Sequence, residues 1–163
     1  MAALALSDLD RLRESVRVEF KLAAGRNGLG QLPEAIWESY SAFANTQGGE
    51  IILGVREHEG QFSIQGIAQP EPLVQQIWQI LEDRSRISCN LLGPRDVQIV
   101  ALADKKLIRI HVPEANKTQK PIFLGSSPFG GTYFRVGDAD MRASHRQVNR
   151  LLRESKHLTP PES

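Results

Sequence analysis

The sequence predicts an α/β fold of the α+β kind, with a mixed β-sheet flanked by helices, and three observations predict it. Apolar residues recur at helical spacing over 32–44 and over 72–81. An unbroken apolar run at 51–55 is typical of a buried strand. The stretch 107–112 alternates apolar and basic side chains, as a strand with one solvent-facing side does. With 163 residues and 40% hydrophobic content, the chain suits one domain with a single core.

The first third of the chain is predicted to alternate helix, strand and helix. Residues 7–15 suit a short helix with Ser7 as its N-cap, and this helix leads into a strand over 16–22. Pro33 suits the first position of the next helix, and the glycine pair at 48–49 ends it.

The middle of the chain is predicted to form a hairpin and a helix. The apolar run 51–55 is expected to be a strand buried on both faces, with 61–67 as its hairpin partner and 56–60 as the polar turn. Residues 72–81 then form a helix, whose apolar stripe is predicted to face the core.

The following segment is predicted to contain the remaining strands. Residues 97–102 and 107–112 form a hairpin with one solvent-facing side. A Pro- and Gly-rich loop follows over 113–131, and 132–136 returns as a strand.

The last predicted helix carries a basic stripe. It begins at Ser144, which forms a capping-box pattern with Gln147. Arginines recur beside its apolar face at i, i+4, i+8 and i+11, a spacing that would meet phosphates by ion pairing and counterion release. The alternative is an ordinary solvated face. The stripe consists of Arg142, Arg146, Arg150 and Arg153.

Other basic residues are candidates for phosphate contact. Tyr133 or Phe134 could also stack on a base, since strand alternation lets only one of them face outward. The candidate phosphate contacts are Arg17, Lys21, Lys117, Lys120 and Arg135.

Composition limits the class of protein. The net charge is +1, from 20 basic and 19 acidic side chains, so any basic surface must be local. The single cysteine, Cys89, excludes an internal disulfide and a zinc site of several thiolates. Because no stretch reads as a secretion signal or a membrane span, we expect a cytoplasmic protein with no membrane contact.

A group of carboxylates is the main candidate for chemistry. Glu14 and Glu19 lie at the boundary of the first helix and strand, and Lys21 shares a strand face with Glu19. Glu57 or Glu59 could complete an oxygen-ligand cluster that holds Mg²⁺ or Mn²⁺ against a phosphate. The alternative is that these carboxylates form ordinary ion pairs with neighbouring basic side chains.

Two longer stretches carry a resemblance to a known family. Residues 14–21, ESVRVEFK, followed by 41–55, SAFANTQGGEIILGV, resemble the two-part signature of the AlbA-like domain of the Schlafen family. Later pieces at 64–66, 108–113 and 133–137 are similar as well. We accordingly expect an N-terminal lead-in over 1–11, the AlbA-like domain over 12–155, and a flexible tail over 156–163.

The resemblance implies a possible catalytic site. Schlafen proteins that cleave transfer and ribosomal RNA build a three-carboxylate metal site on this signature, and the matching positions are Glu14, Glu19 and, by spacing, Glu57, with Lys21 beside them. The third position is Glu here, where those nucleases carry Asp. The animal nucleases also pair two such lobes and add a zinc finger, whereas this chain has one lobe, so a homodimer could restore the pairing.

We therefore expect a nucleic-acid-binding module that binds RNA or DNA and could be regulatory. The alternative is an endoribonuclease that depends on Mg²⁺ or Mn²⁺, and a third option is a protein-interaction or assembly module. The glycine-containing stretches at 45–49 and 125–131 lack the Lys-Ser/Thr pair of a phosphate loop, so no nucleotide cofactor is expected.

Overall fold

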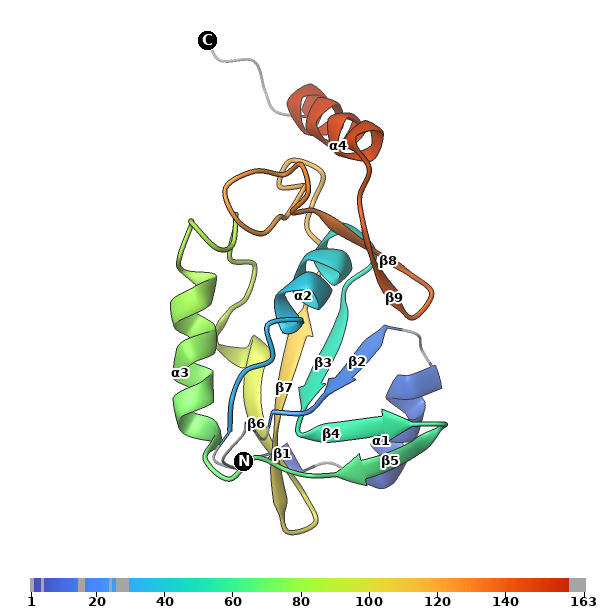
Figure 1. Ribbon diagram of the computed structural model, residues 1–163, viewed down its shortest axis with the longest axis vertical. Helices are drawn as coiled ribbons and strands as arrows, with labels where there is room; N and C mark the ends of the chain where they lie inside the picture. The colour runs from blue at the N-terminus through green and yellow to red at the C-terminus, as the bar shows by residue number, and fades with distance from the viewer. Residues whose placement is uncertain (1, 4, 15–16, 24, 26–29, 159–163) are drawn as a thin grey trace.

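The computed structural model describes residues 2–3, 5–14, 17–23, 25 and 30–158 (Figure 1). Within these residues, no helix is long and apolar enough to cross a membrane.

A mixed β-sheet forms the centre of the fold, as the sequence predicts. Its strands are β1 (Ala2–Ala3), β6 (Val97–Leu102), β7 (Lys105–Val112), β3 (Gly49–Leu53) and β2 (Val18–Lys21), in that spatial order. The β1–β6 and β2–β3 pairs are parallel, and the central pairs are antiparallel. The sheet is therefore mixed, and β2 lies at one of its edges.

Both faces of this sheet are covered. Helices α2 (Ile36–Asn45) and α3 (Pro70–Leu81) contribute to one apolar cluster. Helix α1 (Leu6–Glu14) and the hairpin of β4 (Val55–His58) and β5 (Gln61–Ile64) contribute to the other. Figure 1 shows α2 and α3 on the near side of the sheet and α1 behind it. The sheet therefore lies between two apolar layers.

Strand β3 shows why the apolar run at 51–55 is unbroken. Ile51 and Leu53 belong to the cluster under α2 and α3, whereas Ile52 belongs to the cluster under α1. All three are at most 1% exposed. Because successive side chains of a strand point to opposite faces, a strand covered on both sides needs apolar residues at every position.

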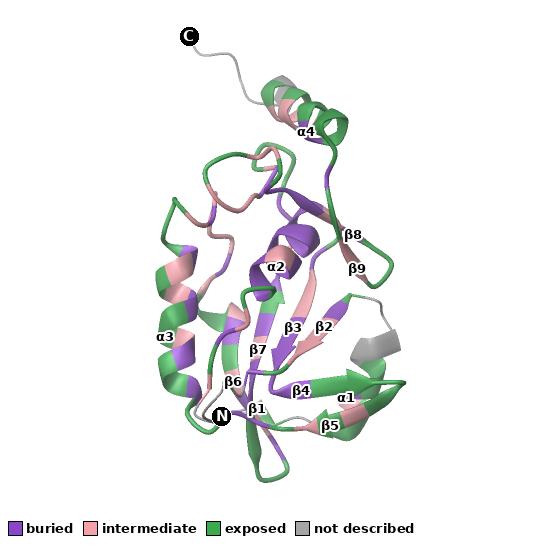
Figure 2. Ribbon diagram, viewed as in Figure 1, coloured by how far each residue is buried: buried purple, intermediate pink, exposed green. Residues whose placement is uncertain are grey.

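The C-terminal part of the chain adds a second hairpin and a helix. Strands β8 (Tyr133–Val136) and β9 (Ala139–Arg142) pair antiparallel, and α4 (His145–Leu158) follows them. The predicted capping box is confirmed: the Ser144 N–H donates to Gln147 Oε1 at 2.8 Å, and the Gln147 N–H donates to Ser144 Oγ at 3.2 Å. Figure 2 shows that α2 is almost wholly buried, whereas α4 is mostly exposed.

The hairpin after β3 differs from the prediction. Residues 61–64 pair with 55–58 and not with the part of the apolar run that lies in β3, and Arg56 to His58 belong to strand β4 rather than to a turn. The cause is Gly54, whose φ of +103° bends the chain out of the central sheet. The Gly54 carbonyl then accepts the N–H groups of Gln65 and Gly66, at 3.0 and 2.9 Å, which closes the base of the β4–β5 hairpin.

Two predicted helix starts were also wrong by a few residues. Ser7 lies inside α1, where the carboxylate of Asp8 accepts the N–H of Ala5 at 2.9 Å in place of a serine cap. Pro33 precedes α2, because residues 33–36 form a separate turn closed by the Ile36 N–H and the Pro33 carbonyl. Short turns before a helix carry the same residue signals as the helix start itself.

Candidate functional site

Two polar side chains of helix α2, Asn45 and Ser41, bond to buried backbone groups of residues 122 and 133. The Asn45 amide donates to the carbonyls of Ile122 and Tyr133, at 2.8 and 3.0 Å, and its oxygen accepts the Ile122 N–H at 2.8 Å. Ser41 Oγ donates to the Ile122 carbonyl and accepts the Tyr133 N–H. Both side chains are at most 4% exposed. They hold β8 in place by side-chain bonds, as buried backbone groups require partners.

Arg135 of β8 connects the hairpin to the edge of the sheet. Its Nη1 donates to Glu19 of β2 and to Asp140 of β9, both at 2.8 Å, and its Nη2 donates to the Val18 carbonyl at 3.0 Å. Ser39 of α2 donates to the other oxygen of Asp140 at 2.5 Å. The Arg135 side chain is 5% exposed. The buried guanidinium of Arg135 therefore links strands β2, β8 and β9.

Burial and ion pairing have opposite effects on the pKa of Arg135. Burial alone would lower the pKa of this guanidinium, but its hydrogen bonds to Asp140 and Glu19 outweigh burial and hold the pKa above its usual value. The group also lies 4.8 Å from the centre of the Phe43 ring, which adds a cation–π contact. Within the described residues its Nε has no hydrogen-bond partner. Arg135 thus stays charged and internal, with little surface for a phosphate.

The structure describes the side chains of two of the three carboxylates that the resemblance implies for a metal site, Glu19 and Glu57. Glu19 has both oxygens in ion pairs, one with Arg135 and the other with Lys21 at 3.4 Å. Glu57 is exposed on β4, and the Glu14 side chain lies outside the described residues. Among the side chains that the structure describes, no three of the His, Cys, Asp and Glu type gather as metal ligands would.

Strand alternation explains the position of Glu19. Val18 and Phe20 of β2 point into the cluster under α1, so Glu19 and Lys21 face the opposite side of the strand. Phe20 packs against Phe62 of β5 at a ring distance of 5.0 Å, and this contact fixes the β4–β5 hairpin.

The glycine pair of the signature is required by close packing. A Cβ on Gly49 would lie 2.5 Å from the Phe43 ring and 2.8 Å from the Arg17 carbonyl, and Gly48 has a φ of +73°. Beside the pair is a hollow of about 390 Å³ with both acidic and basic residues in its lining. Its Glu50 accepts hydrogen bonds from Arg109 at 3.2 Å and lies 3.2 Å from His111 Nδ1, so the carboxylate is already paired.

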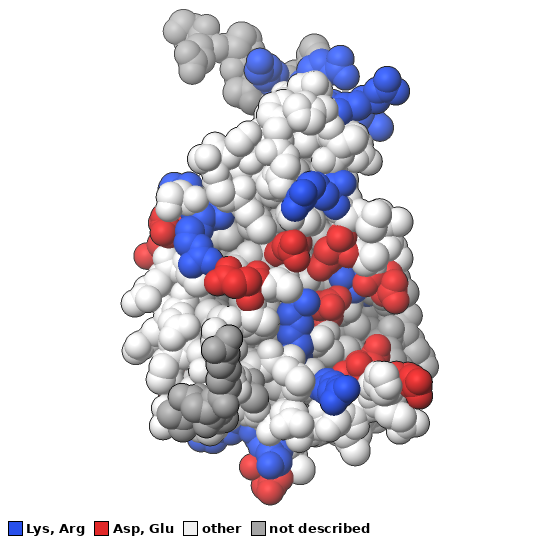
Figure 3. Space-filling view, viewed as in Figure 1, with Lys and Arg blue, Asp and Glu red and all other residues white. Residues whose placement is uncertain are grey.

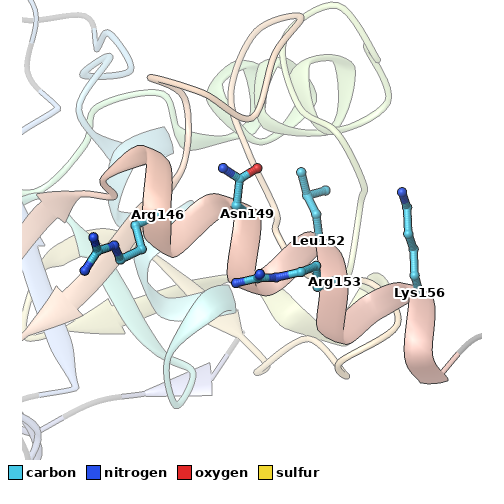
Figure 4. Close-up of a pocket in the computed structure, with 5 residues that line it drawn as sticks. All are labelled: Arg146, Asn149, Leu152, Arg153 and Lys156. Atoms are coloured by element: carbon cyan, nitrogen blue, oxygen red, sulfur yellow. The ribbon is translucent and has the colours of Figure 1, made fainter.

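Three of the four Arg and Lys side chains of α4 line one hollow. This hollow of about 580 Å³ has five described residues of α4 in its lining, and none of these five is acidic. We call the residues that line this hollow the basic face of α4. In Figure 4, Asn149, Leu152 and Lys156 point the same way from the helix. In Figure 3, blue Lys and Arg atoms gather over α4 at the top of the molecule, whereas Asp and Glu are seen beside Lys and Arg over the rest of this face. The basic face consists of Arg146, Asn149, Leu152, Arg153 and Lys156.

The other predicted arginines of the stripe lie elsewhere. Arg142 belongs to strand β9 and not to the helix, and its guanidinium donates to the Tyr133 hydroxyl at 3.2 Å. The stripe prediction was wrong there, because Gly137 and Asp138 turn the chain into a hairpin before the helix begins. Arg150 is on α4, but it pairs with Glu154 at 3.1 Å on another side of the helix.

The loop lysines and Arg17 differ in their surroundings. Lys117 is exposed and adjoins Thr118, whose carbonyl accepts a hydrogen bond from Ser155 of α4 at 3.0 Å. Lys120 is paired with Glu114 at 2.8 Å. Arg17 is exposed and donates to the Gln47 carbonyl at 3.3 Å.

Another side of α4 faces strand β8. A hollow of about 320 Å³ lies between α4 and β8, with Phe134, Val136 and Leu151 in its lining. Val136 is 61% exposed, and Met141 of β9 is 52% exposed. Of the two aromatics of β8, Tyr133 is buried and Phe134 is the one that faces this hollow. On this side of α4, apolar side chains therefore lie beside Gln147 and the Arg150–Glu154 ion pair.

The fold and these surfaces define a small α+β domain with a mixed sheet, a side-chain-anchored hairpin and a basic last helix. The chain belongs to the Schlafen AlbA_2 family, whose model matches residues 14–144. Helix α4 follows directly after the matched residues.

Comparison with solved structures agrees with the fold. The N-terminal domain of a RecG-related protein from Nitrosomonas europaea, named for its relation to an ATP-dependent DNA helicase, is 28% identical, with a TM-score of 0.59. The match covers 85% of this chain and 90% of that domain. The DIP2311 protein from Corynebacterium diphtheriae is 22% identical with a TM-score of 0.53, over 90% of this chain and 28% of that one. The comparison with curated proteins gives no match.

Proposed function

We propose that this domain binds nucleic acid through the basic face of α4. The observation that carries the proposal is the grouping of Arg146, Arg153 and Lys156 around one hollow, whose described lining residues include no carboxylate. Membership of the Schlafen AlbA_2 family and the likeness to a helicase-related domain support nucleic-acid binding by the domain, and α4 itself follows the residues that the family model matches.

The charge distribution makes α4 the best candidate surface. The whole chain has a net charge of +1, so it exerts no general attraction on a polyanion. Helix α4 alone carries four Arg and Lys residues against one acidic residue, Glu154, which is a local charge of about +3. Glu154 pairs with Arg150, which leaves the basic face without a counter-charge from its own lining.

Binding at this surface is expected to depend on salt. Each phosphate that an Arg or Lys neutralises releases condensed counterions, and the affinity falls with salt concentration by a slope of about 0.9 per contact on duplex DNA. Three cations on the basic face therefore predict a slope of about −3. Asn149 lies among them and can both donate and accept hydrogen bonds, which suits a base or sugar edge.

The test is a fluorescence-anisotropy titration of labelled RNA and DNA with the whole chain, repeated over a range of salt. Arg153→Ala and Lys156→Ala should each weaken binding and reduce the magnitude of the slope by about 1. Lys106→Ala removes the same charge from an exposed position at the β6–β7 turn and is the matched control. If the salt dependence of the affinity were unchanged in both α4 variants, the proposal would be contradicted.

The same samples test the nuclease alternative. Adding Mn²⁺ or a chelator before electrophoresis shows whether the nucleic acid is cleaved, and Glu19→Gln should abolish any cleavage that depends on metal. Glu19 is already engaged by Arg135 and Lys21, and the described residues offer no carboxylate cluster, so we expect a shift without cleavage. The homodimer and the assembly role stay predictions.

A further inference from the structure

A pair of rings lies at the N-terminal end of the basic face. The rings of Phe129 and His145 are 4.6 Å apart between centroids and are tilted by 31° to each other. His145 is the first residue of α4 and is exposed, and Phe129 is partly exposed. Two flat rings in contact at the surface form a platform of the kind on which bases stack.

The loop that carries Phe129 is held in one conformation. The Phe129 N–H donates to Ser127 Oγ at 3.2 Å, and Thr132 Oγ1 donates to the Pro128 carbonyl at 2.7 Å. Gly131 has no room for a side chain, since a Cβ there would collide with the Leu124 carbonyl. The ring of Phe129 is therefore presented by a tight, hydrogen-bonded turn, and little ordering is required when a ligand binds.

The platform is aligned with the cations. His145, Asn149 and Arg153 follow each other at i, i+4 and i+8, so they lie along one side of α4. Arg146 follows His145 directly, and Lys156 continues the same side one turn further. A strand whose base rests on the rings would place its next phosphates beside these cations.

We infer that the basic face of α4 binds single-stranded nucleic acid, with one unpaired base stacked on the Phe129–His145 platform. This inference rests on the proposed function and specifies its substrate class. In a duplex the bases are stacked inside the helix and cannot reach a protein ring, so only the cations would contribute. In a single strand, the stacking and the phosphate contacts both contribute.

The experiment compares a mixed-sequence single strand with its own duplex, in RNA and in DNA form, at one salt concentration. The wild-type chain should bind the single strand more tightly. His145→Ala and Phe129→Leu should each weaken single-strand binding about five-fold or more. A loss of affinity of about five-fold corresponds to the weakest stacking energy expected for one base on one aromatic ring. Duplex binding and the salt slope should hardly change, since neither variant removes an Arg or Lys.

Two controls separate stacking from a structural role of the ring pair. His145→Tyr restores a ring and should recover most of the single-strand affinity. His111→Ala removes an exposed histidine of β7 that lies beside Glu50, outside the basic face, and should leave the affinity unchanged. A fluorescent base analogue in the single strand should be quenched by the wild-type chain and not by His145→Ala.

The outcomes distinguish the two proposals. Equal or tighter binding of the duplex, with no effect of His145→Ala on the single strand, would overturn the single-strand inference and leave nucleic-acid binding in place. Equal losses on single strand and duplex in both ring variants would also overturn it. No binding of any form at low salt would overturn the proposed function itself.

Discussion

At the scale of single residues, Tyr40 shows how this core uses a buried polar group. Its hydroxyl donates to the Cys89 carbonyl at 2.8 Å and accepts the Leu91 N–H at 3.0 Å, and the residue is 1% exposed. Burial raises the pKa of Tyr40 to about 12, and the hydrogen bond from Leu91 offsets only part of that effect. The phenol thus ties α2 to the segment after α3 in its neutral form.

This pKa predicts a loss of stability at high pH. The unfolded chain releases the Tyr40 proton near pH 10, whereas the folded chain keeps it until about pH 12, so stability is complete below about pH 10 and falls between those values. The free energy of unfolding, measured by urea titration, should fall by about 2–3 kcal/mol over this range. The Tyr40→Phe variant should have a smaller free energy of unfolding than the wild type at neutral pH. Its free energy of unfolding should also fall less than that of the wild type when the pH is raised. An identical pH dependence in the variant would contradict this account.

At the scale of elements, the β8–β9 hairpin is attached to the rest of the molecule by side chains. Asn45 and Ser41 of α2 bond the backbone of residues 122 and 133, and Thr46 Oγ1 accepts the Arg135 N–H at 2.9 Å. The hairpin forms its own two-stranded sheet and is not paired with the central one. Its position, and that of α4 after it, therefore depends on a few buried polar groups.

Asn45→Ala tests this attachment. The variant would leave the buried Ile122 carbonyl and N–H and the Tyr133 carbonyl short of partners, so the free energy of unfolding should fall by about 2–4 kcal/mol. Hydrogen exchange should quicken in β8 and β9 more than in β3. Asn149→Ala, at an exposed position, should change stability by less than about 0.5 kcal/mol. Equal effects of the two substitutions would refute the anchoring role.

Much of the fold could be predicted from the sequence because local patterns carry it. Strand β3, which covers 51–53 of the predicted strand, and the capping box at 144–147 each follow from residues that are neighbours in the chain. The β4–β5 hairpin was mispredicted because Gly54 alone marks the bend. The role of Asn45 could not be predicted, since its partners lie 77 and 88 residues away.

The candidate site was predicted in part for the same reason. Arg146 and Arg153 follow from helical spacing, and continuing that spacing from Arg146 through i+3 and i+10 would have added Asn149 and Lys156. Asp140 and Ser39 were missed because their interaction joins positions 101 residues apart. The internal position of Arg135 has the same cause, since Glu19 lies 116 residues away.

At the scale of the whole molecule, the domain separates a packed core from an exposed last helix. The two apolar clusters and the Arg135 ion pairs belong to the core, and Lys and Arg gather on α4 at the end of the molecule (Figure 3). Charge is therefore distributed unevenly, although the net charge is only +1. This arrangement predicts that a polyanion approaches α4 first, by electrostatic attraction over a Debye length of about 10 Å.

The measurement that tests the central claim most directly is a nitrogen–proton correlation spectrum of the labelled chain, recorded while nucleic acid is added. The account predicts that the largest shifts occur at the amides of Arg146, Asn149, Arg153 and Lys156, with the β6–β7 turn unchanged. Shifts that gather around Glu19 and Glu57 while α4 stays unchanged would contradict it and would move the binding site to the carboxylates of the signature.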